Sequence, residues 1–279
     1  MLYRPALMLI FLLLFTMSRL VQASAATGRT LTAILEQKSQ RLGLIELGQP
    51  LPLFALSGTL DSSAAKGRQQ GLMETVDANR TRLLQLVDAQ WDRQLAKDKS
   101  LVLLKRYPQV AAIWSASDGM ALGAIEAAKL AGRRPGKDVL VGGVDWEPEA
   151  LESIRSGELA VSLGRHFMGG GLALLLLHDY HYGFDFSDDK SPPVLGYQLK
   201  PASLDNVDTV EQVMDPEHWQ NVDFRRFSRR SDSGKPERRQ SADELLDEFT
   251  RALTEAYPRS SSRLPVSVAA DSSPDSVNR

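Results

Sequence analysis

Several residues that can recognise a small polar molecule stand directly after short apolar segments of this chain. Asp145 and Trp146 follow the apolar run 139–144, and Ser117 and Asp118 follow a similar run. Carboxylates and hydroxyls form hydrogen bonds, whereas an indole ring packs against an apolar face. The chemistry that these residue types offer is therefore recognition of a ligand.

The elements that must position these residues are five repeated units, each a short apolar strand followed by a helix. The strands are expected at 51–57, 83–87, 110–114, 139–144 and 159–163, and the helices at 62–76, 92–106, 119–131, 148–156 and 168–181. This alternation predicts an α/β fold, an open parallel sheet with helices on both faces, as in one Rossmann-like or flavodoxin-like lobe. Because ligands of such sheets bind beyond the carboxyl ends of the strands, the recognition residues should line one edge.

The first 25 residues have the features of an export signal. Arg4 supplies the positive start, residues 6–17 form an apolar stretch, and small residues at 23–25 offer a cleavage site. About 12 apolar residues are too few to span a bilayer, which takes about 20. We therefore expect a cleaved signal peptide at 1–25, with an uncleaved anchor as the alternative. Because the chain has no cysteine, its stability must come from a packed core.

Composition argues against several functional classes. With 33 Lys+Arg against 35 Asp+Glu, the formal charge is −2, so nucleic acid is not an expected partner. The sequence has no G-x-S-x-G or H-E-x-x-H motif and no cysteine nucleophile, so no enzyme is expected. His178 and His181 share one helical face but have no third ligand at a useful spacing. We therefore expect no metal and no other cofactor.

The remaining segments flank the strand–helix units. An amphipathic helix is predicted at 30–42 and one further strand at 192–199. Residues 201–240 are expected to be an extension that ends in a linker rich in Ser and Arg. A capping box opens a tail helix predicted at 241–256. Residues 257–279 have little to bury, and we expect them to be disordered.

A series of short motifs suggests a family. In chain order they are Ser57-Gly58-Thr59, Arg68-Gln69-Gln70-Gly71, Gln90-Trp91-Asp92-Arg93, Ser117-Asp118-Gly119-Met120-Ala121-Leu122-Gly123-Ala124 and Val144-Asp145. In this combination, residues 30–200 resemble the C-terminal lobe of type I periplasmic binding proteins, the sugar-binding subunits of ABC importers. That family has two similar lobes that close on the ligand, and most of the N-terminal lobe has no counterpart here. The resemblance implies a periplasmic protein with a sugar-like ligand and an inner-membrane permease as partner.

The resemblance also implies ligand contacts for three residues. Asp145 stands where the family places an aspartate on ligand hydroxyls, Trp91 where an aromatic ring faces the ligand, and Arg68 where an arginine clamps it. A sugar suits such a set, because its hydroxyls bond to charged planar groups and its C–H faces pack on rings. Ordinary roles remain open: Asp145 could cap the next helix, Trp91 could belong to the core, and Arg68 could be solvated.

Four further candidates follow from the same comparison. Ser117 replaces an asparagine that the family commonly has, and Asp118 is expected to cap the next helix more readily than to contact a ligand. Trp146 either walls the cleft or packs in the core. His166 stands where glutamine is usual in sugar binders, with Arg165 as the alternative substitute.

We therefore predict an exported, non-catalytic receptor that delivers a sugar or a similar small polar solute to an ABC importer. Because one lobe covers a ligand on one side only, binding by this chain alone should be weak. The alternative is a periplasmic ligand-sensing partner of a histidine kinase, chemoreceptor or diguanylate cyclase, since the same fold serves there. A third possibility is a non-binding remnant.

Overall fold

The computed structural model describes residues 50–76, 80–184, 196–228 and 241–255. The predicted export signal, the first amphipathic helix, most of the linker rich in Ser and Arg, and the tail after residue 256 lie outside the described residues. Within the described ranges, no helix combines the length and the apolar character needed to cross a membrane.

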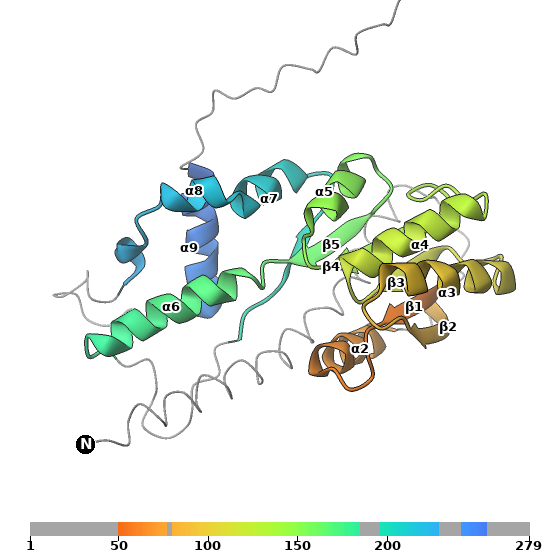
Figure 1. The fold of residues 1–279 in the computed structure, drawn as a ribbon, viewed down its shortest axis with the longest axis horizontal. Coiled ribbons are helices and arrows are strands. Elements are labelled where there is room, and N and C mark those ends of the chain that lie inside the picture. The colour runs from red at the N-terminus through yellow and green to blue at the C-terminus, as the bar shows by residue number, and fades with distance from the viewer. Residues whose placement is uncertain (1–49, 77–79, 185–195, 229–240, 256–279) are drawn as a thin grey trace, which may run out of the picture.

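A mixed sheet organises the described part of the chain (Figure 1). Its six strands are β1 (Leu51–Ser57), β2 (Thr81–Asp88), β3 (Ala112–Ser115), β4 (Leu140–Val144), β5 (Val161–Gly164) and β6 (Lys200–Ala202). They lie in the order β2-β1-β3-β4-β5-β6. The pairs among β1 to β5 are parallel, whereas β6 runs antiparallel to β5 at the edge. The predicted parallel sheet is confirmed, with this antiparallel edge as an addition.

Five helices follow the first five strands, as predicted. They are α2 (Ser63–Thr75), α3 (Arg93–Arg106), α4 (Asp118–Leu130), α5 (Pro148–Arg155) and α6 (Met168–His181). The chain moves from β1 to β2 in one direction and from β2 to β3 and onward in the other. Because crossovers are right-handed, this reversal places α2 on one face of the sheet and α3 and α4 on the other (Figure 1).

Apolar composition explains why the central strands are buried. Every residue of β3 and β4 is buried, and in β1 only Pro52 is partly exposed. Strands covered on both faces are apolar throughout and do not alternate with polar residues. The largest fully buried side chain, Trp114, lies in this core between the helix layers.

The C-terminal region corrects two predictions. No strand forms at 196–199, the described part of the predicted strand 192–199, and β6 begins only at Lys200. The extension at 201–240 contains α7 (Val207–Met214), α8 (Pro216–Gln220) and a 3-10 helix (Phe224–Phe227). Helix α7 forms because its valines recur at a helical spacing and are buried.

The predicted tail helix is confirmed as α9 (Ala242–Glu255), and it is part of the folded body. Its capping box is present, because the Ser241 amide donates to Glu244 Oε2 at 2.8 Å and the Glu244 amide donates to Ser241 Oγ at 3.2 Å. Leu246 and Phe249 are fully buried in a second apolar cluster with α6. Figure 1 shows α9 lying against α6, apart from the first strands.

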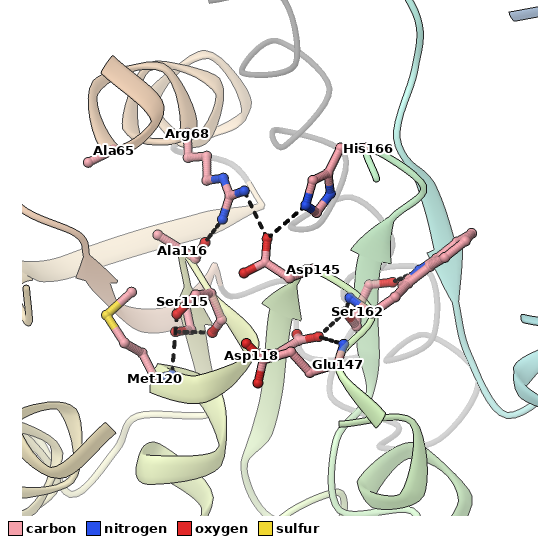
Figure 2. Close-up of polar contacts among 12 residues, drawn as sticks. Ala65, Arg68, Ser115, Ala116, Asp118, Met120, Asp145, Glu147, Ser162 and His166 are labelled. Atoms are coloured by element: carbon pink, nitrogen blue, oxygen red, sulfur yellow. Dashed lines mark hydrogen bonds and ion pairs between the residues drawn. The ribbon is translucent and has the colours of Figure 1, made fainter. Parts of the chain in front are cut away.

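A buried carboxylate joins three elements beneath the carboxyl edge of the sheet (Figure 2). Asp118, at the start of α4, is fully buried, and its Oδ2 accepts from the Ser162 hydroxyl at 2.7 Å and from the Glu147 amide at 3.0 Å. Its Oδ1 lies against Gly143 and has no hydrogen-bond partner among the described residues. Burial raises the pKa of Asp118 to about 7, and the charges of Asp145 and Glu147 raise it further.

This carboxylate predicts how stability depends on pH. Between about pH 4 and pH 7 the folded protein holds a proton that the unfolded chain has released, so the free energy of unfolding falls as pH rises. The whole decrease is on the order of 4 kcal/mol. Asp118→Asn keeps an acceptor for Ser162 and the Glu147 amide but cannot ionise. The free energy of unfolding of this variant should therefore fall less steeply as pH rises. Urea unfolding followed by circular dichroism at several pH values measures the difference.

The matched control is Asp98→Asn, because Asp98 is exposed on α3. Its pH profile should follow that of the parent protein. Equal declines in Asp118→Asn and the parent would contradict the elevated pKa of Asp118.

Candidate functional site

The carboxyl edge of the sheet contains the point where the strand order reverses. The crossover from β1 leads to β2 on one side, and the later crossovers lead to β3, β4 and β5 on the other. The loops after β1 and β3 therefore diverge from each other, and ligands of open α/β sheets usually bind at such a point.

An ion pair spans this edge (Figure 2). Arg68 comes from α2, and its Nη2 lies 2.9 Å from Oδ1 of Asp145, which directly follows β4. Its Nη1 donates to the carbonyl oxygen of Ala116, after β3. The two side chains remain 16% and 23% exposed, so a ligand in solution can reach both.

Trp91 lies beside this pair. The guanidinium carbon of Arg68 is 5.5 Å from the centre of the Trp91 ring, within the range of a cation–π contact. The indole Nε1 donates to Thr59 Oγ1 at 3.2 Å. The ring covers Gly58, where a Cβ would lie 2.0 Å from Trp91 Cε2, so this close approach requires glycine.

His166 completes the group. Its Nε2 lies 3.7 Å from Asp145 Oδ1, the oxygen that Arg68 also contacts. Burial lowers the pKa of His166, and the nearby Arg68 charge lowers it further, whereas Asp145 raises it. The imidazole is therefore mainly neutral at pH 7 and can both donate and accept. We call Arg68, Trp91, Asp145 and His166 the edge cluster.

Strained backbone marks the loops that carry this cluster. Among the described residues, the non-glycine residues with positive φ all follow β2, β4 or β5: Gln90 (55°), Trp91 (62°), Asp145 (130°), Trp146 (61°) and Arg165 (90°). Such conformations cost about 1–3 kcal/mol each and persist only where the surroundings enforce them. Strain of this kind concentrates at ligand sites, which agrees with the position of the edge cluster.

The structure therefore brings four predicted residues together and gives the other three interior positions. Ser117 is 7% exposed, and its hydroxyl accepts from the Met120 amide at 3.3 Å. Ser117 is therefore the N-cap of α4, and the prediction that Asp118 caps this helix is wrong by one residue. Asp118, fully buried beneath the edge, offers no surface to a ligand in this conformation.

Trp146 also packs inside the protein. It is 4% exposed, its Nε1 donates to the Ser162 carbonyl at 3.1 Å, and its ring covers Gly164. The N-cap residue of helix α5 is Glu147, which makes no side-chain capping bond, so Asp145 does not cap this helix. The Asp145 carboxylate instead forms the ion pair with Arg68. Of the two roles left open for Trp146, packing is the one that its contacts show.

Two features of this region were not predicted from the sequence. Thr59, visible as a polar residue after β1, orients the Trp91 indole. Arg165, the alternative to His166, is 1% exposed and turned toward α9, where Asp243 and Asp247 bind it. The separation along the chain hides such a contact from local patterns.

A separate pocket of about 370 Å³ opens between β6, α7 and α9. Trp146, Arg165, Lys200 and Val210 are among its lining residues, whereas no member of the edge cluster lines it. Within the described ranges, no group of three potential metal ligands occurs.

Comparison with known proteins adds independent evidence. A family model described as "Periplasmic binding protein domain" matches residues 23–176, more than half of the chain. A crystal structure of a periplasmic sugar-binding protein from Pseudomonas fluorescens is similar with a TM-score of 0.66 and 33% identity, over 81% of this chain and 67% of that chain.

Two curated relatives are also named as sugar-binding proteins. The ribose import binding protein of Salmonella typhimurium is 31% identical over 118 residues, 42% of this chain and 39% of the relative. The galactofuranose-binding protein of Escherichia coli is 28% identical over 120 residues, 42% of this chain and 38% of the relative. The chain thus spans about two-fifths of the length of these relatives. With the fold and the family match in agreement, this chain belongs to the type I periplasmic binding proteins.

Proposed function

We propose that this chain binds a small sugar-like solute at the edge cluster and presents it to an inner-membrane ABC permease. The observation that carries this proposal is the convergence of Arg68, Trp91 and Asp145 at one edge of the sheet. The relatives named for ribose and galactofuranose support the sugar class.

The chemistry of the cluster suits a neutral polyol. Arg68 offers N–H donors and Asp145 offers acceptors, so together they can bind hydroxyl groups that donate and accept. Their charges offset each other at 2.9 Å, which leaves little net attraction for an ion. Trp91 supplies an apolar face for the C–H side of a sugar ring. Neutral His166 adds a further polar group beside Asp145.

The described residues would cover such a ligand on one side. Small-molecule sites bind tightly when they bury most of the ligand surface, and an open edge leaves much of it in water. We therefore infer weak binding by this chain alone, with a dissociation constant on the order of 1 mM. Residues from another chain or lobe that covered the other side of the ligand would raise the affinity. Closure around the ligand would then be the signal that the permease reads.

The importer function is favoured over the sensing alternative, because the curated relatives include an import binding protein. No specific contact of the described residues favours a histidine kinase, chemoreceptor or diguanylate cyclase as partner.

Sugar binding can be tested at the Trp91 indole. Titration of the isotope-labelled protein with D-ribose, D-allose or D-galactose should shift the indole N–H resonance of Trp91, assigned with Trp91→Phe, in the millimolar range. Asp145→Asn should weaken binding about tenfold or more, because hydrogen bonds to a charged group are lost. Arg68→Gln should have a similar effect.

The matched control is Arg134→Gln, which removes one exposed positive charge from the loop before β4, at the amino end of the strands. Its affinity should equal that of the parent. No response of Trp91 to any of these sugars would refute the proposed site. A micromolar or tighter affinity would instead contradict the one-sided site.

Export is also part of the proposal. Expression of the full chain with an intact secretion pathway should yield a periplasmic protein that begins after residue 25, since small residues at 23–25 offer a cleavage site. Intact-mass measurement of the purified protein reads the new N-terminus. A chain that retains its first 25 residues in the membrane fraction would show an anchor instead.

A further inference from the structure

The turn that leads into His166 is held from outside the sheet. Arg165 is 1% exposed, and its guanidinium points to α9. Its Nη1 donates to Asp247 Oδ1, and its Nη2 donates to Asp243 Oδ1 and, at 2.7 Å, to the carbonyl oxygen of Gln198. The only polar atom of this guanidinium without a partner among the described residues is Nε.

The same two carboxylates bind the chain that leads into β6. Asp243 Oδ1 also accepts from the Gln198 amide at 2.8 Å, and Asp247 lies 3.3 Å from Nζ of Lys200. Helix α9 therefore connects the turn after β5 with the segment before the edge strand. We call Asp243, Asp247 and Arg165 the α9 clamp.

The clamp lies where the backbone is strained. Arg165 has a φ of 90°, a conformation that residues other than glycine rarely adopt without external support. A buried guanidinium is stable only when its charge is paired, so the side chain has a strong preference for its place between the two carboxylates. The carboxylates of α9 thus favour the observed backbone conformation, in which Arg165 reaches them.

That conformation sets the direction of the next residue. His166 follows Arg165 directly, and its Nε2 lies 3.7 Å from Asp145 Oδ1, which Arg68 also contacts (Figure 2). A continuous series of contacts therefore runs from α9 through Arg165 to the edge cluster. Helix α9 lies beyond residues 23–176, which the family model matches.

We propose that Asp243 and Asp247 are positioning residues of the edge cluster, which act through Arg165 to hold His166 against Asp145. The consequence for ligand affinity rests on the proposed function, whereas the positioning itself does not. The competing explanation is that α9 only stabilises the fold, since it also buries Leu246 and Phe249 against α6.

The two explanations differ in the coupling between His166 and Asp145. In the parent chain, Asp145→Asn should lower the proton affinity of His166 about fivefold, the effect of one charge at about 4 Å in water. In the double variant Asp243→Asn/Asp247→Asn, His166 should no longer be held against Asp145. Adding Asp145→Asn should then change the proton affinity of His166 less than about twofold, because charge effects weaken with distance. The His166 ring resonances, assigned with His166→Gln, give both titrations by NMR. Arg68 is the other charged group facing His166, and it is present in every variant.

The matched control is Asp208→Asn/Glu211→Gln. These changes remove the same number of negative charges from α7, where both residues bind Arg155 at 2.8 and 2.9 Å, and they leave the clamp intact. The fivefold effect of Asp145→Asn should persist in this background. An equal effect in the clamp background would overturn the positioning role and leave α9 a purely stabilising helix.

A single clamp variant and a measurement of sugar affinity complete the test of the positioning role. If the double clamp variant shows no cooperative unfolding transition, Asp247→Asn alone can replace it, because this variant keeps Asp243 on Arg165. The effect of Asp145→Asn on His166 should then be intermediate. An effect as large as in the parent chain would refute the proposal. Sugar affinity, measured at Trp91, should fall at least about threefold in the clamp variant and not in the control, if the edge cluster binds sugar. Absence of sugar binding in the parent would refute the proposed function, while the His166 titrations would still decide the positioning role.

Discussion

The ion pair between Arg68 and Asp145 is the interaction on which the candidate site depends. Arg68 comes from α2, on one face of the sheet, whereas Asp145 directly follows β4, and the next helix begins only after Glu147. Partly exposed pairs contribute about 1 kcal/mol or less to stability, so the importance of this pair is not stability. Its importance is geometric, because it holds a donor and an acceptor at fixed positions beside the Trp91 ring.

Such a pair needs a rigid support, and the strained turns beneath it are supported by unusual packing. Trp91 can adopt its left-handed conformation because Gly58 leaves room for the ring, and Trp146 is held in the same way over Gly164. Trp146 also donates to the Ser162 carbonyl, while the Ser162 hydroxyl donates to Asp118. The strained turns at both tryptophans are thus supported by packing that would be lost if the turn relaxed.

Sequence patterns predicted the sheet and the edge at which Asp145 lies, for a physical reason. Apolar strands followed by helices restrict the chain to a parallel sheet, and the residues after those strands must meet at one edge. Asp145 was found in this way, whereas Arg68, Trp91 and His166 were found through their resemblance to positions of the family. Strand order does not, however, determine the direction of individual side chains in a left-handed turn. This is why Trp146 and Arg165 could not be placed, since each neighbours a cluster residue yet points elsewhere.

The remaining errors come from contacts that local patterns cannot show. The cap of α4 was misplaced by one residue because Ser117 and Asp118 are both residue types that cap helices well. What distinguishes them is that the Ser162 hydroxyl and the Glu147 amide donate to the buried Asp118 carboxylate. The bonds from Arg165 to α9 join residues 78 and 82 positions apart. A capping box followed by an amphipathic helix predicted α9 itself but not its partner, since its carboxylates at 243 and 247 look like ordinary solvated charges. A buried arginine with two such partners is informative, because removing the partners would leave a buried charge unpaired, which is costly.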